Sequence, residues 1–143
     1  MTITATRIIE WDAGHRLLRH ESKCAHVHGH RYRAEVTVEA RELDSVGRVV
    51  DFGVIKELVG GWVDTNWDHA FIVGDEDLEM KRFLVENSQK HYTFYAEPTA
   101  ENMALVLFDI ATLLLPPSIS VVRVRIWETP NCYVDATRGE VTL

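Results

Sequence analysis

The chain of 143 residues has no long hydrophobic run, few cysteines and no excess of positive charge. Nothing in it approaches the about 20 consecutive apolar residues of a membrane-spanning helix, so we expect no membrane association. A formal net charge of −7 leaves no broad basic surface, which argues against a nucleic-acid partner. The amino terminus has neither a basic stretch nor an apolar core, so we expect no signal peptide and a cytoplasmic location.

The sequence also lacks internal repeats and low-complexity tracts, and its length suits one domain, which we expect to span residues 1–143. Its two cysteines, Cys24 and Cys132, are too few for a disulfide framework, although they could pair with each other. A small buried residue is the commonest role of a free cysteine. Because Cys24 lies in a polar stretch rich in histidine, we interpret it instead as a reactive or metal-facing thiol.

What the chain does have is a concentration of histidine beside Cys24. His28 and His30 form a His-x-His pair, and side chains two residues apart on a strand lie on one face. A third imidazole would complete a three-nitrogen zinc site with one position open for water or substrate. We predict His15 as the third ligand, but spacing alone leaves His20 and His26 as alternatives. The pattern favours a catalytic metal site over a closed structural one.

Hydrophobic periodicity predicts an α+β fold with the order strand, strand, helix, helix, strand, strand. The alternating segments place strands at residues 3–11, 30–40, 119–128 and 131–137. Helical apolar stripes follow Asp51, where Phe52 and Ile55 begin the first stripe, and Thr99. Residues 74–96 are expected to form a short charged helix and a small strand at 90–95.

Three acidic positions attract attention for different reasons. Glu128 continues the inward parity of Val122, Val124 and Ile126, and a carboxylate on a buried face is costly unless it is partnered, so we expect it to recognise a ligand. Asp68 precedes a histidine, His69, that could serve as an acid or base, although a solvated loop is an equal alternative. Glu101 stands in the first turn of the second helix, where a carboxylate suits the helix dipole.

Six short motifs occur along the chain in one order: Ala13-Gly14-His15-Arg16-Leu17, Cys24-x-x-x-His28-Gly29-His30, Val50-Asp51-Phe52, Asp68-His69, Pro98-Thr99-Ala100-Glu101-Asn102 and Trp127-Glu128-Thr129. Together they resemble the family of 6-pyruvoyl-tetrahydropterin and 6-carboxytetrahydropterin synthases over residues 7–134. The segment 74–96 is atypical of the family, and Ala70-Phe71-Ile72-Val73 stands where a Leu-Asn pair is usual. The three residues between Cys24 and His28 are similar to the bacterial 6-carboxytetrahydropterin synthases.

This resemblance implies a tunnelling fold (T-fold), in which a four-stranded antiparallel sheet carries two helices on one face. It also implies homo-oligomers, as trimers whose sheets close into a barrel or as hexamers, with sites at subunit interfaces. The matching residues are, by resemblance, zinc ligands (His15, His28, His30), a catalytic thiol (Cys24), its acid–base partners (Asp68, His69) and substrate-binding residues (Glu128, Glu101, Thr99).

The implied activity is that of a zinc-dependent carbon–carbon lyase. Its substrate would be 7,8-dihydroneopterin triphosphate, and its products 6-carboxytetrahydropterin, acetaldehyde and triphosphate, in queuosine and 7-deazaguanine biosynthesis. One alternative is a triphosphate-eliminating lyase that forms 6-pyruvoyl-tetrahydropterin. Another is a zinc- and pterin-binding module without turnover, against which the retained thiol and acid–base pair argue.

Overall fold

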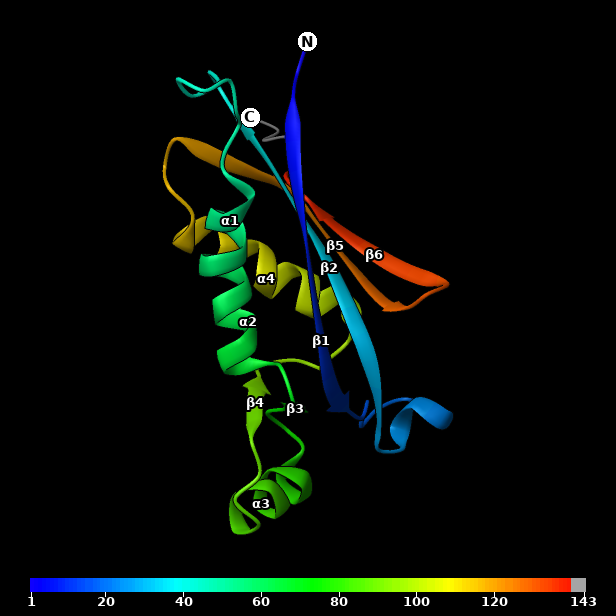
Figure 1. Cartoon of the computed structure of the whole chain (residues 1–143). Helices are drawn as coiled ribbons and strands as arrows, with labels where there is room; N and C mark the ends of the chain where they lie inside the picture. Colours follow the sequence, from blue (N-terminus) through cyan, green and yellow to red (C-terminus); the bar gives the residue numbers. More distant parts are fainter. Residues whose placement is uncertain (140–143) are drawn as a thin grey trace.

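The structure, a computed structural model, describes residues 1–139 and is built around a curled six-stranded sheet (Figure 1). The strands are β1 (Thr4–His15), β2 (His28–Ala40), β3 (Ala70–Gly74), β4 (His91–Phe94), β5 (Ile119–Thr129) and β6 (Cys132–Thr137). The helices are α1 (Phe52–Ile55), α2 (Gly61–Asn66), α3 (Leu78–Glu86) and α4 (Ala100–Leu114). The strand order across the sheet is β4-β3-β1-β2-β5-β6.

Strands β1, β2, β5 and β6 form the antiparallel part of the sheet, as the alternating sequence predicts. The apolar residues of β2 that share one face, such as Tyr32 and Val36, are fully buried. On β5 the inward parity changes at an irregularity opposite Thr37, so that Val121 is buried where Val122 was expected. Beyond this irregularity the expected inward positions of β5 hold.

The sheet has six strands and not the four that we predicted. Strands β3 and β4 extend it beyond β1, and both run parallel to their neighbours. Residues 90–95 were expected to form a small strand, but the strand at Ala70–Gly74 was missed. Its apolar residues form a continuous run, which is typical of a parallel strand buried on both faces and carries no alternation.

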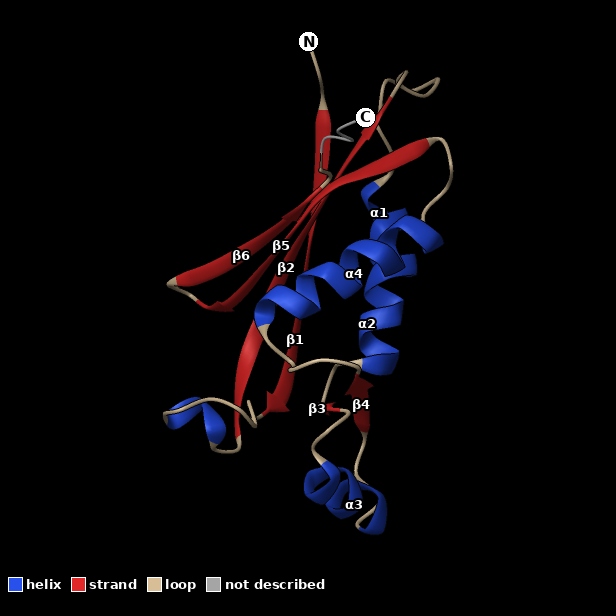
Figure 2. Cartoon of the chain, turned by 180° about the vertical axis from the view of Figure 1, so that it is seen from behind, coloured by secondary structure: helices blue, strands red, loops and turns tan. Residues whose placement is uncertain are grey.

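Both long helical segments cover the same face of the sheet (Figure 2). Asp51 caps the first of them through its Oδ1, which accepts a hydrogen bond from Gly53 N at 2.8 Å. A π-helical segment, Lys56–Gly60, joins α1 to α2. Ile55, the last residue of α1, is fully buried, whereas Phe52, which we placed in the same apolar stripe, is 53% exposed. Within residues 1–139, no helix combines the length and the apolar character needed to cross a bilayer.

No helix of residues 1–139 covers the other face of the sheet (Figure 2), and charged side chains lie on it. Ion pairs cross it, among them Arg31 with Asp12 and Arg125 with Asp135. A charged face of this kind suits a water-filled or inter-subunit space better than a packed core. Closure of several sheets into a barrel concerns assembly and stays a prediction.

Candidate metal centre

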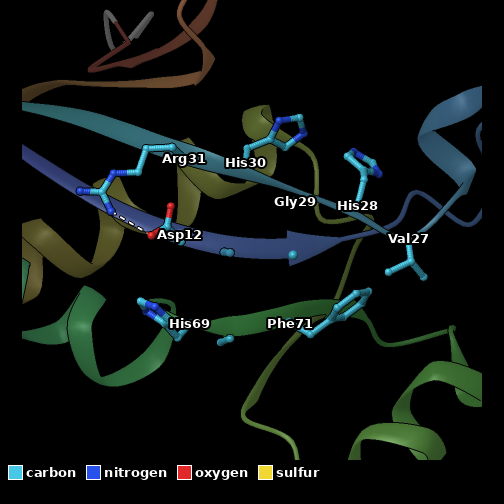
Figure 3. A pocket seen from close by; sticks show the side chains of 11 residues that line it. Asp12, Val27, His28, Gly29, His30, Arg31, His69 and Phe71 are labelled. Atoms are coloured by element: carbon cyan, nitrogen blue, oxygen red, sulfur yellow. Dashed lines mark hydrogen bonds and ion pairs between the residues drawn. The ribbon is translucent and has the colours of Figure 1, made fainter.

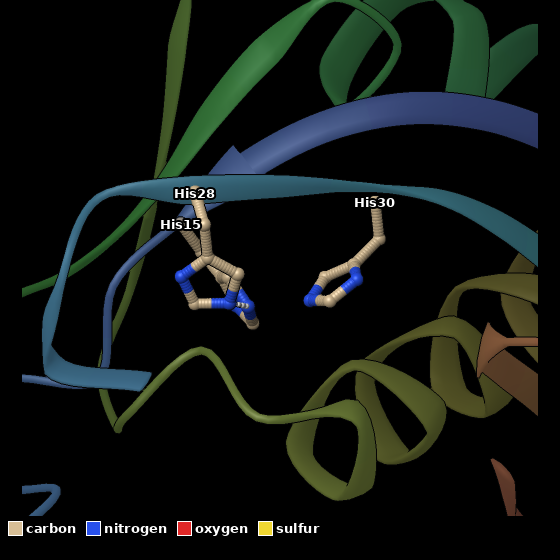
Figure 4. A group of neighbouring side chains, drawn as sticks. All are labelled: His15, His28 and His30. Carbon is tan, nitrogen blue, oxygen red and sulfur yellow. Dashed lines mark hydrogen bonds between the residues drawn. The ribbon is translucent and has the colours of Figure 1, made fainter. Parts of the chain in front are cut away.

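Three histidines meet where β1 ends and β2 begins (Figure 4). His15 and His28 are direct partners in the antiparallel ladder, and His30 follows His28 on the same face of β2. The ring centroids are 4.6 Å apart for His15 and His28, 5.2 Å for His15 and His30, and 4.9 Å for His28 and His30. One nitrogen of each ring lies within 4.8 Å of the others, so the structure brings the predicted ligand set together.

The hydrogen bonds of two rings fix their tautomers. His15 Nδ1 lies 2.7 Å from the carbonyl oxygen of Pro98, and His28 Nδ1 lies 2.7 Å from that of His26. A carbonyl oxygen only accepts, so each Nδ1 carries a proton, and in the neutral form of each ring Nε2 keeps a free lone pair. These two Nε2 atoms face each other at 3.0 Å. Opposed lone pairs repel unless a cation lies between them, which is the arrangement expected of metal ligands oriented by carbonyl oxygens.

His30 supplies the third nitrogen of the cluster. Its Nε2 is buried and has no hydrogen-bond partner among the described residues, and it lies 3.7 Å from Glu128 Oε1. Burial lowers the pKa of His30, and burial also lowers the pKa of His15 to about 4, against the hydrogen bond to Pro98. These two imidazoles are therefore neutral near pH 7. The donor set suits zinc, which binds neutral imidazole and accepts three nitrogens with a fourth position open.

The structure also decides among the alternative histidines. His20 Nδ1 accepts a hydrogen bond from Ser22 N at 3.0 Å, within the turn that joins β1 to β2. His26 contributes its carbonyl oxygen to His28 and no ring nitrogen to the cluster. His26 therefore orients one ligand, and His15 is the third ring nitrogen in the cluster.

Sequence reasoning assigned no role in the site to Tyr32. Its hydroxyl lies 3.3 Å from His15 Nδ1, and its ring stacks on Trp11 with centroids 5.5 Å apart. Burial raises the pKa of Tyr32, as does the charge of Glu128, so the hydroxyl stays neutral. The signal available in the sequence was its parity, since Tyr32 is the next inward residue of β2 after His30.

Cys24 lies in a single 3₁₀ turn, Lys23–Ala25, just before β2. Its carbonyl oxygen accepts a hydrogen bond from Leu17 N at 2.8 Å, which holds this turn against the segment that follows β1. The thiol is partly buried and unpaired. It is not one of the three groups that form the cluster of ligand atoms. Cys132 is exposed, although a buried position is the commonest for a free cysteine.

Asp68 and His69 are held together at the start of β3. Asp68 Oδ1 lies 3.0 Å from His69 Nδ1 and accepts a hydrogen bond from Asp12 N at 3.1 Å. Burial acts to raise the pKa of Asp68, but these hydrogen bonds and the charges of His69 and Lys90 outweigh it and lower the pKa. The backbone of His69 is left-handed, with φ of 56°, a conformation that strains a residue with a side chain.

The acid–base pair and the histidine cluster lie on opposite faces of the sheet. His15 points to the helix-covered face, whereas Asp12, the neighbour of Asp68 and His69, points to the other. An open cavity of about 530 Å³ is lined by His69, Asp12 and Phe71, and also by His28 and His30 of β2 (Figure 3). The ligand atoms of His69 nevertheless group with those of Asp12 and Asp68, and not with the three imidazoles.

Glu128 lies beside the cluster at the end of β5 and is partly exposed. It lines a second cavity, of about 480 Å³, with His30, Trp127, Arg31 and Arg33 among the other lining residues. This cavity offers a carboxylate acceptor next to an aromatic ring and two guanidinium groups. A planar heterocycle with a charged tail is the kind of ligand that such a lining can hold.

The two remaining site candidates lie at the start of α4. Thr99 caps the helix, because its Oγ1 accepts a hydrogen bond from Asn102 N at 3.2 Å. Glu101 is exposed in the first turn, as its suitability for the helix dipole led us to expect. Thr99 therefore has a structural role of its own, and substrate binding by these two residues stays a prediction.

Comparison with known proteins adds a family and a set of relatives. The family model described as 6-pyruvoyl tetrahydropterin synthase matches residues 4–139. A protein of Rickettsia bellii named 6-carboxy-5,6,7,8-tetrahydropterin synthase is 44% identical over 136 residues, which cover 93% of this chain and 99% of that protein. A Halobacterium salinarum protein named as a probable 6-carboxy-5,6,7,8-tetrahydropterin synthase is 35% identical over 125 residues, covering 87% and 79%.

Solved structures agree with the fold. An uncharacterised protein from Wolinella succinogenes superimposes with a TM-score of 0.84 at 20% identity, covering 97% of this chain and 99% of that one. The 6-pyruvoyl tetrahydropterin synthase of Caenorhabditis elegans gives a TM-score of 0.73 at 24% identity, with 97% of each chain covered. At these identities the likeness concerns the fold alone.

Proposed function

Since this chain belongs to the 6-pyruvoyl tetrahydropterin synthase family and is a lyase, we propose that it is a zinc-dependent 6-carboxy-5,6,7,8-tetrahydropterin synthase. The reaction would convert 7,8-dihydroneopterin triphosphate and water to 6-carboxytetrahydropterin, acetaldehyde and triphosphate. The product would enter queuosine and 7-deazaguanine synthesis, as the sequence resemblance implies. The observation that carries the zinc site is the approach of His15 Nε2 and His28 Nε2 to 3.0 Å while the Nδ1 atom of each ring bonds to a carbonyl oxygen.

His15, His28 and His30 would hold the zinc ion through their Nε2 atoms. When bound, zinc supplies Lewis acidity that polarises and acidifies the hydroxyl groups of the substrate side chain. The lowered pKa values of His15 and His30 support this assignment, because neither ring must lose a proton to bind the metal near pH 7.

Proton transfer is the role that we assign to three other residues. Cys24, as a thiolate, would remove a proton from a carbon of the substrate side chain. His69 would return or remove protons, and Asp68, at 3.0 Å from His69 Nδ1, would orient its imidazole. Because His69 and the histidine cluster lie on opposite faces of one sheet, we infer that a neighbouring subunit supplies this pair.

Glu128 would anchor the pterin ring. Its carboxylate can accept hydrogen bonds from the N–H edge of the heterocycle, and a bidentate acceptor that the bound ring covers discriminates strongly against ligands without matching donors. Its place 3.7 Å from His30 Nε2 would put the ring next to the metal. Arg33 in the same cavity supplies a guanidinium group for a phosphorylated ligand, whereas Arg31 is paired with Asp12.

Product analysis tests this proposal. Zinc-loaded protein would be incubated with 7,8-dihydroneopterin triphosphate, and the pterin and acetaldehyde identified by mass spectrometry, with zinc-stripped protein as the control. We expect acetaldehyde and 6-carboxytetrahydropterin from the zinc-loaded protein alone. A pyruvoyl pterin without acetaldehyde would instead identify the triphosphate-eliminating lyase, and zinc binding without turnover would identify a pterin-binding module.

A further inference from the structure

Asp77 is the one carboxylate-bearing residue that is buried among residues 1–139, with 4% of its surface exposed. It forms a bidentate ion pair with Arg16, in which Arg16 Nε donates to Oδ2 and Nη2 donates to Oδ1, each at 2.6 Å. A buried pair of this kind costs desolvation, so its presence suggests that it fixes a geometry. It also links two segments that are 61 residues apart in the sequence.

The pair is attached to the metal centre at one end. Arg16 is the first residue after β1, and His15 is the last residue within it. At His15 the strand is paired on both sides, with His28 of β2 and with Ile72 of β3. The ion pair therefore fixes the main chain at Arg16, immediately after the last residue of β1 that is held by strand pairing.

The other end of the pair is itself firmly placed. Asp77 N donates to Gly74 O at 3.0 Å, which ties it to the end of β3. Its Oδ1 also accepts a hydrogen bond from Met80 N at 3.2 Å and so caps α3. Figure 1 shows α3 beyond the ends of β3 and β4, on the side toward which β1 points.

The ring of His15 depends on the same region. Its Nδ1 bonds to Pro98 O, and the chain reaches Pro98 directly from β4. Asp75 N donates to Phe94 O at 2.6 Å, and a Cβ on Gly74 would lie 3.3 Å from Ala96 O, so the two strands of this region leave the sheet in close contact. Residues 74–98 therefore hold the main chain beside His15 and also accept the hydrogen bond that fixes the tautomer of its ring.

We propose that Asp77, acting through Arg16, is a positioning residue for the metal ligand His15, and that the segment 74–96 holds the metal centre in place. The inference rests on the zinc site of the proposed function. A structural role would affect folding stability alone, whereas a positioning role affects the affinity for the metal.

Zinc affinity of the purified full-length chain separates these roles. Asp77→Asn removes the charge yet retains a residue that caps helices well, so α3 should persist. Arg16→Gln removes the other partner, and the double variant completes a cycle. The matched control is Asp135→Asn, which breaks the bidentate pair of Asp135 with Arg125 at 2.8 and 2.9 Å on strands β5 and β6. Zinc dissociation constants come from competition with a chromogenic chelator, and thermal unfolding of the zinc-free proteins provides the stability comparison.

We expect each single variant of the Arg16–Asp77 pair to bind zinc about tenfold more weakly, the size of effect seen when the outer support of a metal ligand is removed. The double variant should lose no more than either single variant, and Asp135→Asn should stay within about twofold of the wild type. Unchanged zinc affinity in Asp77→Asn, or an equal loss in Asp135→Asn, overturns the positioning role alone. A wild-type chain that binds no zinc overturns the metal site of the proposed function as well.

Discussion

At the residue scale, the metal centre is defined by where protons are placed. His15 Nδ1 donates a hydrogen bond to the carbonyl oxygen of Pro98, and His28 Nδ1 donates one to the carbonyl oxygen of His26. The His-x-His spacing predicted which rings lie on one face. It could not predict their tautomers, because the carbonyl that orients His15 belongs to a residue 83 positions away in the sequence.

We predict that the thiol of Cys24 is needed for turnover but not for metal binding. Cys24 is not part of the cluster of ligand nitrogens. Cys24→Ala should therefore keep the wild-type zinc content, measured by atomic emission, and the wild-type circular dichroism spectrum. Turnover of 7,8-dihydroneopterin triphosphate should fall by at least about 100-fold, the usual value of a positioned acid or base. Near-normal turnover would remove Cys24 from the mechanism.

His69 gives a prediction about strain, because its φ of 56° is accessible to glycine without cost. Both His69→Gly and His69→Ala should lose turnover through loss of the imidazole. His69→Gly should nevertheless be more stable than His69→Ala by about 1 kcal/mol, since only the alanine carries a Cβ in the left-handed region. Urea unfolding followed by circular dichroism measures the difference, and equal stabilities would contradict it.

At the scale of elements, the sequence predicted the antiparallel strands and both long helices but underestimated the sheet. Alternation of apolar and polar residues identifies a strand with one solvent-exposed face, as in β2. The run at Ala70–Gly74 has no alternation, and its pairing with β1 depends on residues Ala13 to His15, each 57 positions before its partner in the chain. The small strand at 90–95 was predicted, but its pairing with β3 depends on tertiary structure that local periodicity does not reveal.

The Arg16–Asp77 pair predicts a specific dependence of stability on pH. A hydrogen bond from Arg16, opposed by burial, holds the pKa of Asp77 below its ordinary 3.8. A lowered carboxylate pKa contributes stability that is complete above the ordinary value and is lost as the pH falls through the folded one. The gap in unfolding free energy between the wild type and Asp77→Asn should hence be constant from pH 7 to about 4 and shrink below that. Urea unfolding across this range measures it, and a gap that persists unchanged at the lowest pH would count against the ion pair.

Lys90 links the segment 74–96 to the main chain at Asp68, next to His69. Its Nζ donates to the carbonyl oxygens of Asp64 and Asp68, at 2.9 and 2.6 Å. We expect Lys90→Met to lower kcat by about tenfold or more, because misplaced general acids lose their effect, while zinc affinity is unchanged. Steady-state kinetics combined with a zinc titration tests this, and a loss of zinc affinity equal to that of Asp77→Asn would contradict it.

At the scale of the whole molecule, the sheet ends in edges that could pair with another copy. Strand β1 pairs with β3 only at Ala13–His15, which leaves its long earlier part without a partner on that side in the described chain. Strand β6 forms the opposite edge of the sheet. Unprotected edges of this length are rare in isolated subunits, which supports the predicted trimer or hexamer. Light scattering on the purified protein determines the mass of the assembly.

A shared active site makes a sharper prediction. If His69 serves a neighbouring subunit, Cys24→Ala and His69→Ala each disable different halves of the same site. Mixing the two inactive proteins, unfolding and refolding them together, should restore measurable turnover, because mixed oligomers contain sites with both residues intact. The control is each variant refolded alone. Absence of any recovered activity in verified mixed oligomers would place both residues in sites of a single chain.

The aromatic packing around Tyr32 makes the protein its own optical reporter. Trp11 stacks on Tyr32 at 5.5 Å, Tyr32 contacts His30 with centroids 5.4 Å apart, and Trp67 and Trp62 continue the cluster. Three of the four indoles in the chain therefore lie within a few side chains of the proposed metal. Loading with Co²⁺, which absorbs visible light, should quench their ultraviolet emission, and displacement by Zn²⁺ should restore it. Occupancy of the site could then be followed continuously in a cuvette, with no dye attached.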